Sequence, residues 1–215
     1  MLTDAQRSAL DAAWQPAREA GVLGSVSIEE LWEHTAGYSS AVCSAFSAEC
    51  STWNGSIIDV GTGCGVPGVL LAAQLPKARL TLVDASERRL MHVRRAVQAL
   101  DFADRALVVH ARGDELAHDP AHRGEYDVAV ARLLADPAET VEQLLPLVAV
   151  GGVVVISVAN ADVSRFLAAD LSDLGGGDAS VESVPSGQLA VVRRVVEGGP
   201  AFPRRVAVRR RSPLF

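Results

Sequence analysis

Hydrophobic and polar positions follow two different periods along the chain, and each period predicts one type of element. Apolar residues at helical spacing predict helices over residues 3–20 and 27–49. From residue 57 onward, short apolar runs alternate with helical patterns. The predicted strands cover 57–60, 79–83, 106–110, 126–130, 152–158, 180–184 and 188–196, and the predicted helices between them cover 67–75, 86–100, 136–148 and 162–174.

This alternation predicts an α/β fold with a doubly wound, mostly parallel sheet of seven strands and helices on both faces. The last two strands flank the turn Pro185-Ser186-Gly187, which predicts an antiparallel hairpin at the edge of the sheet. We therefore divide the chain into an N-terminal helical cover (residues 1–54), a Rossmann-like core (55–199) and a short tail (200–215).

A glycine-rich turn joins the first predicted strand to the helix that follows it. Residues 59–68 read Asp-Val-Gly-Thr-Gly-Cys-Gly-Val-Pro-Gly. Glycine accepts positive φ angles and has no Cβ to clash, so the backbone can approach a ligand, and the following helix offers unpaired N–H groups at its start. This favours a nucleotide-like cofactor. Gly63 to Gly68 also fit G-x-G-x-x-G, so the glycines alone leave NAD, FAD and S-adenosylmethionine open.

Two aspartates near this turn favour S-adenosylmethionine. Asp59 precedes the first glycine by two residues, where a carboxylate is unfavourable beside a pyrophosphate but suits the cationic amino group of a methionine moiety. Asp84 ends the next predicted strand, in position to accept hydrogen bonds from ribose hydroxyls. The alternative is a glycine-rich turn with two solvated aspartates. The spacing of turn and acid favours the cofactor site.

Two further positions come just after predicted strands, at the edge where open α/β sheets bind ligands. Gly113 and Asp114 follow strand 106–110, where a carboxylate can accept a hydrogen bond from the exocyclic amine of adenine, although Asp114 could instead cap a helix. Arg132 follows strand 126–130 and would face the same crevice. The alternative for Arg132 is an unrelated surface ion pair.

The cysteines and histidines give no support for a disulfide framework or a metal site. Cys43, Cys50 and Cys64 are odd in number and lack C-x-x-C spacing, which favours a reducing cytoplasm. We interpret Cys64, inside the glycine turn, as a small apolar filler rather than a nucleophile. His118 and His122 flank a proline that breaks any shared helical face, so we expect no metal.

Hydropathy predicts a globular chain without a membrane span. With 215 residues and 49% hydrophobic content, the chain can bury one substantial core. The longest apolar run, residues 144–158, contains Pro146 and Gly151-Gly152, and we interpret it as a helix end, a turn and a buried strand. The first nineteen residues are polar and helix-like rather than a signal peptide.

Charge is unevenly distributed along the chain, and the distribution bears on the partner. The net charge is −6, but residues 193–215 hold seven arginines against one glutamate, a local +6 that leaves −12 on the remainder. The guanidinium fork binds phosphate oxygens in pairs, so this cluster matches a nucleic acid. The alternative is a solvated terminus without function.

The segments that carry a family resemblance run from about Leu31 to the C-terminus. The glycine turn with its Pro-Gly ending is the most specific of them, and the others follow at 82–89, 111–115, 131–135, 145–152, 202–205 and 211–214. Together they resemble the bacterial small-subunit ribosomal RNA (guanine-N7)-methyltransferases, once called glucose-inhibited division protein B. The order of elements is likewise similar to that of class I methyltransferases, in which the βα units are followed by an antiparallel hairpin.

The resemblance implies an S-adenosylmethionine-dependent methyltransferase of the cytoplasm that acts on N7 of a guanine in 16S ribosomal RNA, alone or in the small subunit. With the arguments above, the implied cofactor contacts are Asp59, Gly61, Gly63, Gly65, Val66, Asp84, Ala85, Gly113, Asp114 and Arg132. His34 and Arg132 would order the reacting groups. The residues expected to hold the RNA backbone are Arg204, Arg205, Arg209, Arg210 and Arg211.

Three departures from the family lie at positions expected on the substrate side. The family's Asn-Leu-Thr segment is missing, its His-x-x-Asp-Ser reads His34-Thr-Ala-Gly-Tyr38, and its Leu-Lys-Gly reads Ser157-Val158-Ala159. These departures keep two other hypotheses open. One is a methyltransferase with a small-molecule acceptor, and the other is a cofactor-binding protein that has lost catalysis.

Overall fold

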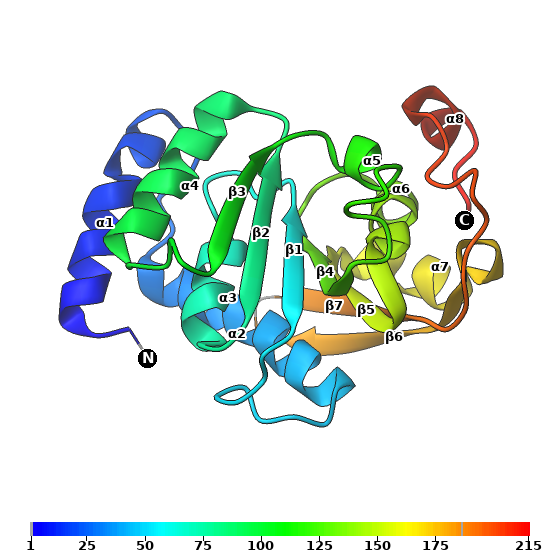
Figure 1. Ribbon diagram of the computed structural model, residues 1–215, viewed down its shortest axis with the longest axis horizontal. Coiled ribbons are helices and arrows are strands. Elements are labelled where there is room, and N and C mark those ends of the chain that lie inside the picture. Colours follow the sequence, from blue (N-terminus) through cyan, green and yellow to red (C-terminus); the bar gives the residue numbers. More distant parts are fainter. Residues whose placement is uncertain (1, 186) are drawn as a thin grey trace.

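The computed structural model describes residues 2–185 and 187–215, so Ser186 of the predicted hairpin turn lies outside the described residues. Its strands are β1 (Ser56–Val60), β2 (Arg79–Asp84), β3 (Ala106–His110), β4 (Tyr126–Ala131), β5 (Val148–Val158), β6 (Gly176–Val184) and β7 (Gly187–Arg194). They form one sheet in the order β3-β2-β1-β4-β5-β7-β6 (Figure 1). β1 to β5 run parallel, and β7 lies antiparallel between β5 and β6. The predicted doubly wound sheet is confirmed.

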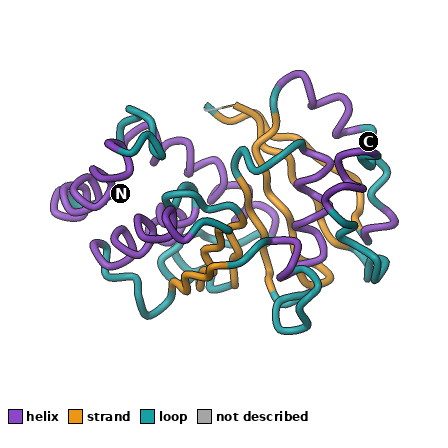
Figure 2. Tube along the Cα trace, turned by 90° about the horizontal axis from the view of Figure 1, so that it is seen from above, coloured by secondary structure: helices purple, strands orange, loops and turns teal. Residues whose placement is uncertain are grey.

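Helices cover both faces of this sheet, and Figure 2 shows the strands running between two groups of helices. They are α1 (Asp4–Glu19), α2 (Ile28–Ala45), α3 (Gly68–Gln74), α4 (Glu87–Ala99), α5 (Gly113–Leu116), α6 (Pro137–Leu144), α7 (Val163–Leu167) and α8 (Val206–Arg211), with short 3₁₀ turns η1 (Leu145–Leu147), η2 (Asn160–Asp162) and η3 (Ser172–Leu174). α1 packs against α4, α2 packs against α3, and α6 packs against β4 and β5.

Residues of the central strands alternate between two hydrophobic clusters, which explains why these strands are apolar on both sides. In β1, Ile57 belongs to the cluster formed with α1 to α4, and the next residue, Ile58, belongs to the cluster formed with α6 and α7. Both isoleucines are fully buried. Burial of each such side chain stabilises the fold by roughly 1.5–3 kcal/mol relative to an exposed one.

The N-terminal helices begin at capping boxes and are tied to the glycine turn. The Glu30 carboxylate accepts the Ser27 N–H at 2.9 Å, and Ser27 in turn caps the Glu30 N–H at the start of α2. In α1, Trp14 is fully buried and its indole N–H donates to the Cys64 carbonyl at 2.8 Å. A hydrogen bond therefore links the N-terminal helical cover to the glycine turn.

Several predicted boundaries are wrong, and two of them have a local reason. The helix predicted over 162–174 is α7, which ends at Leu167, because the Asp170 carboxylate accepts the Ser172 N–H at 3.0 Å in a turn that competes with the helix. The turn predicted at Gly151-Gly152 lies inside β5, where the pairing with β4 is irregular and Gly151 has a φ of 91°. No helix among the described residues is both long and apolar enough to cross a membrane.

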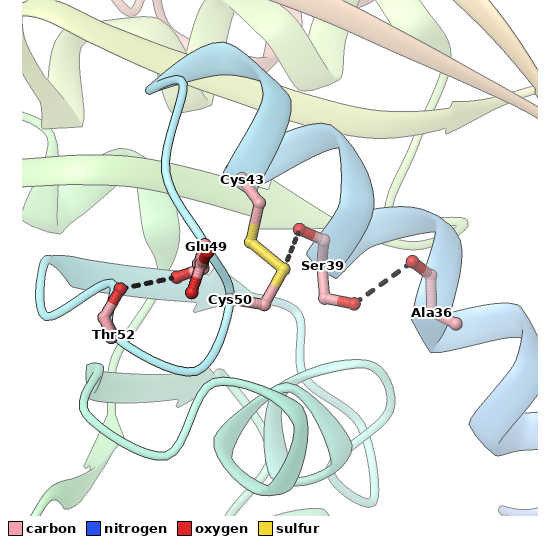
Figure 3. Close-up of a disulfide and its surroundings, with 6 residues drawn as sticks. All are labelled: Ala36, Ser39, Cys43, Glu49, Cys50 and Thr52. Atoms are coloured by element: carbon pink, nitrogen blue, oxygen red, sulfur yellow. Dashed lines mark hydrogen bonds between the residues drawn. A yellow bond between two sulfur atoms is a disulfide. The ribbon is translucent and has the colours of Figure 1, made fainter.

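The prediction that the cysteines form no disulfide is wrong for Cys43 and Cys50 (Figure 3). α2 ends at Ala45 rather than at residue 49, and the chain turns back through Ser47, whose φ is 50°. This turn brings the two Cα atoms to 5.6 Å, within reach of a disulfide bond of 2.01 Å. Disulfides are rare in reducing compartments, so cysteine usage no longer supports the cytoplasm.

The disulfide has a direct test in the number of free thiols. In denaturant without reductant, a thiol reagent should detect one thiol, the buried Cys64, and after reduction it should detect all three cysteines. Replacing Cys43 and Cys50 together by serine should lower the free energy of unfolding by about 2 kcal/mol, because the short loop is no longer closed in the unfolded chain. Cys64→Ala is the control and should remove the single thiol signal. Three thiols before reduction would contradict the bond.

Candidate functional site

Predicted cofactor residues from several segments meet in one cavity at the carboxyl edge of the sheet. The cavity has a volume of about 150 Å³ and lies beyond the ends of β1, β2 and β3. Of the predicted residues, it is lined by Gly61, Asp84, Ala85, Gly113 and Asp114. Parallel strands present their carboxyl ends at the same edge, which explains how residues far apart in sequence converge here. The remaining residues of the predicted turn, Asp59, Gly63, Gly65 and Val66, shape the glycine turn beside it.

The glycine turn is fixed to β2 by backbone hydrogen bonds. Gly61 and Thr62 both donate their N–H groups to the Val83 carbonyl, at 2.8 and 2.9 Å. Gly61 has a φ of 72°, which glycine adopts without steric cost. A Cβ at Gly61 would also collide with the side chain of Leu134, so the cavity wall at this point is bare backbone.

Asp59 holds the turn against the start of α3. Its Oδ2 accepts the Gly68 N–H at 2.9 Å and the Thr62 hydroxyl at 2.6 Å. A Cβ at Gly68 would meet this same oxygen, so the close approach requires glycine. Asp59 is fully buried, and its removal from water raises its pKa to about 6, although the bonds from Thr62 and Gly68 oppose the rise.

In the described part of the chain, the second oxygen of Asp59 is left without a partner, although Asp59 is not among the residues that line this cavity or the larger one lined by His34 and Arg132. Asp59 Oδ1 is buried and has no hydrogen-bond partner among the described residues. An unpaired buried acceptor carries a desolvation cost that a bound ammonium group would offset. The bonds to Gly68 and Thr62 belong to the folded chain itself, whereas the contact with a cofactor stays a prediction.

Asp84 ends β2, and backbone N–H groups orient both of its oxygens. Oδ2 accepts the Gly63 N–H at 3.0 Å and Oδ1 accepts the Ser86 N–H at 2.9 Å. The Arg89 guanidinium lies 3.7 Å from Oδ2. Each carboxylate oxygen offers two lone-pair sites, so both oxygens keep capacity for a further donor. Asp84 thus fits the predicted contact with ribose hydroxyls.

Asp114 lies inside α5, whose N-cap is Arg112, so the alternative role of Asp114 as a helix cap is wrong. Its Oδ1 accepts Arg112 Nε–H at 3.0 Å, and its Oδ2 accepts Arg209 Nη2–H at 3.2 Å. Burial would raise the pKa of Asp114, but the hydrogen bonds and charges of the two arginines outweigh it and lower the pKa. The carboxylate is therefore ionised at neutral pH and can accept a hydrogen bond from an amine.

His34 and Arg132 meet at a second cavity of about 420 Å³. Arg132 and Leu133 line this cavity and the next residue, Leu134, lines the smaller one, so one short segment contributes to both cavities. Burial, and then the positive charge of Arg132, lower the pKa of His34, which leaves it neutral at pH 7. Its Nε2 is buried without a hydrogen-bond partner among the described residues.

Arg132 is available to a ligand. None of the ion pairs between described residues includes it, so the alternative of a surface ion pair is not what the structure shows. Its charge acts on His34 and, more weakly, on the buried Asp59 and Cys64 of the glycine turn. Arg132 lines the second cavity but not the cofactor cavity, so its predicted contact with the cofactor stays a prediction.

The walls of the second cavity are mostly apolar and include one of the departures from the family pattern. Val158, which stands where the family has lysine, lines the cavity together with Val184 and Leu189. Tyr38, at another departure, is fully buried and donates its hydroxyl to the Ala131 carbonyl at 3.2 Å. The cavity therefore offers a mainly apolar surface, and its polar lining consists of Glu30, His34, Arg132, Ser157 and Gln188.

The arginines of the tail differ in how far they reach solvent. Arg204 forms a salt bridge with Glu142 at 2.7 Å, and Arg209 is 1% exposed and paired with Asp114. Arg205, Arg210 and Arg211 are exposed. The expectation that all five tail arginines face an RNA backbone must therefore be corrected: the guanidinium groups of Arg204 and Arg209 are bound inside the protein.

The sequence did not predict three residues of the site. Gln143 lines the cofactor cavity from the buried face of α6, Leu134 packs against Gly61, and the Trp14 indole donates to the Cys64 carbonyl. Gln143 and Trp14 lie in segments that sequence patterns describe as ordinary helices. Leu134 lies in the segment 131–135 that carries the family resemblance, but only Arg132 of that segment was predicted as a site residue.

The two histidines considered as metal ligands bind other groups. His118 Nε2 lies 2.8 Å from the Pro203 carbonyl, and His122 Nδ1 lies 2.7 Å from the Tyr126 hydroxyl. Within the described part of the chain, no three metal-ligating side chains gather at one point.

Comparison with known proteins gives consistent similarities. Residues 14–169 match the family model for rRNA small subunit methyltransferase G, GidB. Proteins named ribosomal RNA small subunit methyltransferase G from Roseiflexus sp. (strain RS-1) and Synechococcus sp. (strain JA-2-3B'a(2-13)) are 34% and 33% identical over 74% and 77% of this chain. These matches cover 70% and 66% of the relatives, so the chain spans about two thirds of their length.

Solved structures support the fold. An S-adenosylmethionine-dependent O-methyltransferase from Thermotoga maritima aligns with a TM-score of 0.61 at 11% identity, over 87% of this chain and 72% of its own. A mutant of MtNAS in complex with S-adenosylmethionine aligns with a TM-score of 0.59 at 16% identity, over 89% and 72%. At these identities the similarity shows the fold alone.

The raised pKa of Asp59 predicts a pH dependence of stability. Between about pH 4 and pH 6 the folded state binds a proton that the unfolded state has released, so the stability from protonated Asp59 is lost as the pH rises through 6. Asp59→Asn keeps an oxygen acceptor for Gly68 and Thr62 but does not titrate. Its free energy of unfolding should therefore rise relative to wild type, by up to about 3 kcal/mol, between pH 4 and pH 7. Urea titrations at several pH values measure this, and parallel curves for the two proteins would contradict the assignment.

Proposed function

Because the chain belongs to the rRNA small subunit methyltransferase G family, we propose that it transfers a methyl group from S-adenosylmethionine to N7 of a guanine in small-subunit ribosomal RNA. One observation supports this above the others: the segment 132–134 contributes both to the cofactor cavity, which contains Asp84 and Asp114, and to a second cavity lined by His34 and Arg132. A donor in the first cavity would face an acceptor in the second. The proposal includes the cytoplasm, where the RNA or the assembled subunit would be the partner.

The chemistry of guanine N7 suits the residues that the chain provides. S-adenosylmethionine, when bound, supplies an electrophilic methyl group on a sulfonium centre. Guanine N7 carries an in-plane lone pair and no proton, so its attack on the methyl group requires no general base. The neutral His34 and the cationic Arg132 would act by orienting the acceptor and excluding water. Catalysis would consist mainly of alignment and of a fixed electrostatic environment.

The second cavity, in which the acceptor would bind, also favours a second candidate function. Its walls of Val158, Val184 and Leu189 would accept a small apolar molecule as well as a base, and the lysine of the family is absent from position 158. A methyltransferase with a small-molecule acceptor is therefore the alternative. Assays on RNA and on a metabolite extract distinguish the two.

The exposed arginines of the tail are the part of the chain best placed to hold RNA. Arg205, Arg210 and Arg211 are exposed on or beside α8, whereas the rest of the chain is acidic. Contacts with phosphates would position the RNA without selecting its sequence. The acidic remainder would disfavour indiscriminate binding elsewhere on the surface.

Methyl transfer is the test of the proposed function. Purified protein with S-adenosylmethionine should methylate small-subunit RNA from a strain that lacks the enzyme, and mass mapping should locate the methyl group on N7 of one guanine. Arg132→Ala should lower kcat about 100-fold because the reacting groups lose their alignment. Arg95→Ala, an exposed arginine of α4 that lines neither cavity, is the matched control. Unmodified RNA together with a methylated metabolite would replace this proposal by the small-molecule one. Binding of NADH but not of S-adenosylhomocysteine would exclude both.

Replacing Arg205, Arg210 and Arg211 together by alanine should raise the KM for RNA and leave the Kd for S-adenosylhomocysteine unchanged. The slope of log K against log salt should become shallower by about 0.7–0.9 for each phosphate contact that is lost. A triple alanine variant at Arg79, Arg88 and Arg95 removes the same charge from exposed positions elsewhere and serves as control. Equal effects of the two variants would mean that the tail has no special part in RNA binding.

A further inference from the structure

The C-terminal segment 202–211 is fastened to the elements that carry the cofactor cavity (Figure 1). Arg204 donates its backbone N–H to Glu142 Oε1 at 2.7 Å, and its guanidinium donates to both oxygens of the same carboxylate at 2.9 and 2.7 Å. Glu142 is 1% exposed and precedes Gln143, which lines the cavity. The tail is thus attached beside the cofactor site rather than extended into solvent.

Further contacts hold the beginning of this segment. Arg123 donates to the carbonyls of Phe202 at 2.7 Å and of Gly199 at 3.3 Å. His118 lies 2.8 Å from the Pro203 carbonyl. These bonds satisfy backbone acceptors along a stretch without regular structure, so the path of the chain up to α8 is fixed.

Arg209 is where the tail, α5 and α6 come together. It is 1% exposed, and its guanidinium donates to the Arg204 carbonyl at 2.6 Å and to Asp114 Oδ2 at 3.2 Å. Glu139 Oε1 of α6 lies 3.7 Å away. A guanidinium offers its donors in a rigid fork, so these acceptors can be held together in one geometry. None of the tail residues lines the cofactor cavity itself.

Asp114 has two arginine partners, and their side chains differ in exposure to solvent. Arg112 donates to both oxygens of Asp114, at 3.0 and 3.2 Å, but its side chain is 50% exposed, so this ion pair competes with water and is weakened by salt. The Arg209 side chain is 1% exposed, so its single hydrogen bond to Oδ2 is screened far less. Arg209 is therefore the partner whose interaction with the carboxylate depends least on solvent and salt.

We propose that Arg209 is a positioning residue of the cofactor site, whose buried guanidinium holds the Asp114 carboxylate in place to accept the exocyclic amine of the adenine ring. The inference rests on the proposed function, because it takes Asp114 as the contact for adenine. The C-terminal segment would then be a structural part of the cofactor site. It contacts the cavity indirectly, through Asp114, which lines the cavity, and through Glu142, which precedes the lining residue Gln143.

The test compares two ligands that differ at one group. S-adenosylhomocysteine carries the 6-amino group, and its 6-deamino analogue carries hydrogen there. Wild type should bind the first at least about tenfold more tightly, since a hydrogen bond to a charged acceptor contributes about 1.5–3 kcal/mol, which is about 10- to 150-fold. Asp114→Ala should reduce this ratio to about one. Arg209→Ala should do the same while binding the deamino analogue nearly as wild type does.

The control is the other arginine that is buried among the described residues. Arg194 is also 1% exposed and donates to the Val148 carbonyl at 2.6 Å, but it contacts neither Asp114 nor the cavity. Arg194→Ala removes a buried charge of the same kind and should destabilise the fold while leaving the tenfold ratio intact. A ratio that changes equally in the Arg194 and Arg209 variants would reduce Arg209 to a residue of general stability and overturn the inference.

A conservative variant keeps the test decisive if Arg209→Ala does not fold. Arg209→Lys retains the charge but presents it as a compact ammonium group without the planar fork, so it should fold and still lose most of the ratio. A full tenfold ratio in a folded Arg209 variant would overturn the inference. If wild type and Asp114→Ala both show no preference for the amine, the assignment of Asp114 to adenine fails instead, and methyl transfer by wild type shows whether the proposed function survives.

Discussion

The bond between the buried Asp59 carboxylate and the Gly68 N–H is the constraint on which the site depends. It joins the end of β1 to the start of α3 across the glycine turn, and the Thr62 hydroxyl shares the same oxygen. With the turn fixed, the Gly63 N–H lies within hydrogen-bond distance of Asp84 at the end of β2. The position of the Asp84 carboxylate therefore depends on that of Asp59 through the glycine turn. The two contacts together fix the shape of the cavity at the ends of β1 and β2. The cost is a carboxylate taken out of water, which is visible in its raised pKa.

Buried carboxylates with fixed hydrogen-bond partners also occur on the other side of the cavity. Glu142 and Asp114 are largely buried, and each is matched by an arginine from the C-terminal segment. Burying one member of such a pair alone would be strongly unfavourable, so the charges of the tail and of α5 and α6 depend on each other. Much of the positive charge near the C-terminus therefore neutralises internal carboxylates. The part left for a nucleic acid is the exposed set on and beside α8.

Local sequence patterns were sufficient for the sheet and for the glycine turn, because both depend on neighbouring residues. Alternating apolar runs determine the strands, and the series of glycines followed by Asp84 predicts where a nucleotide-like cofactor would bind. Pairings across the fold had no such signal. Arg204 meets Glu142 at a separation of 62 residues and Arg209 meets Asp114 at a separation of 95, so a cluster of arginines looked like an exposed surface. The Cys43–Cys50 bond likewise depends on where α2 ends, which periodicity locates poorly.

The segment after β4 contributes to both cavities, with Arg132 lining the larger one and Leu134 lining the smaller one. Leu133 has a φ of 52°, an uncommon conformation for a residue with a bulky side chain, and its side chain is 82% exposed. Its N–H donates to the Ser157 hydroxyl at 3.2 Å, and the next residue, Leu134, packs against Gly61 of the glycine turn. Such a conformation costs roughly 1–3 kcal/mol and persists because contacts on both sides determine it. The two residues after Arg132 are thus bonded to β5 on one side and packed against the glycine turn on the other, so the position of Arg132 depends on both elements.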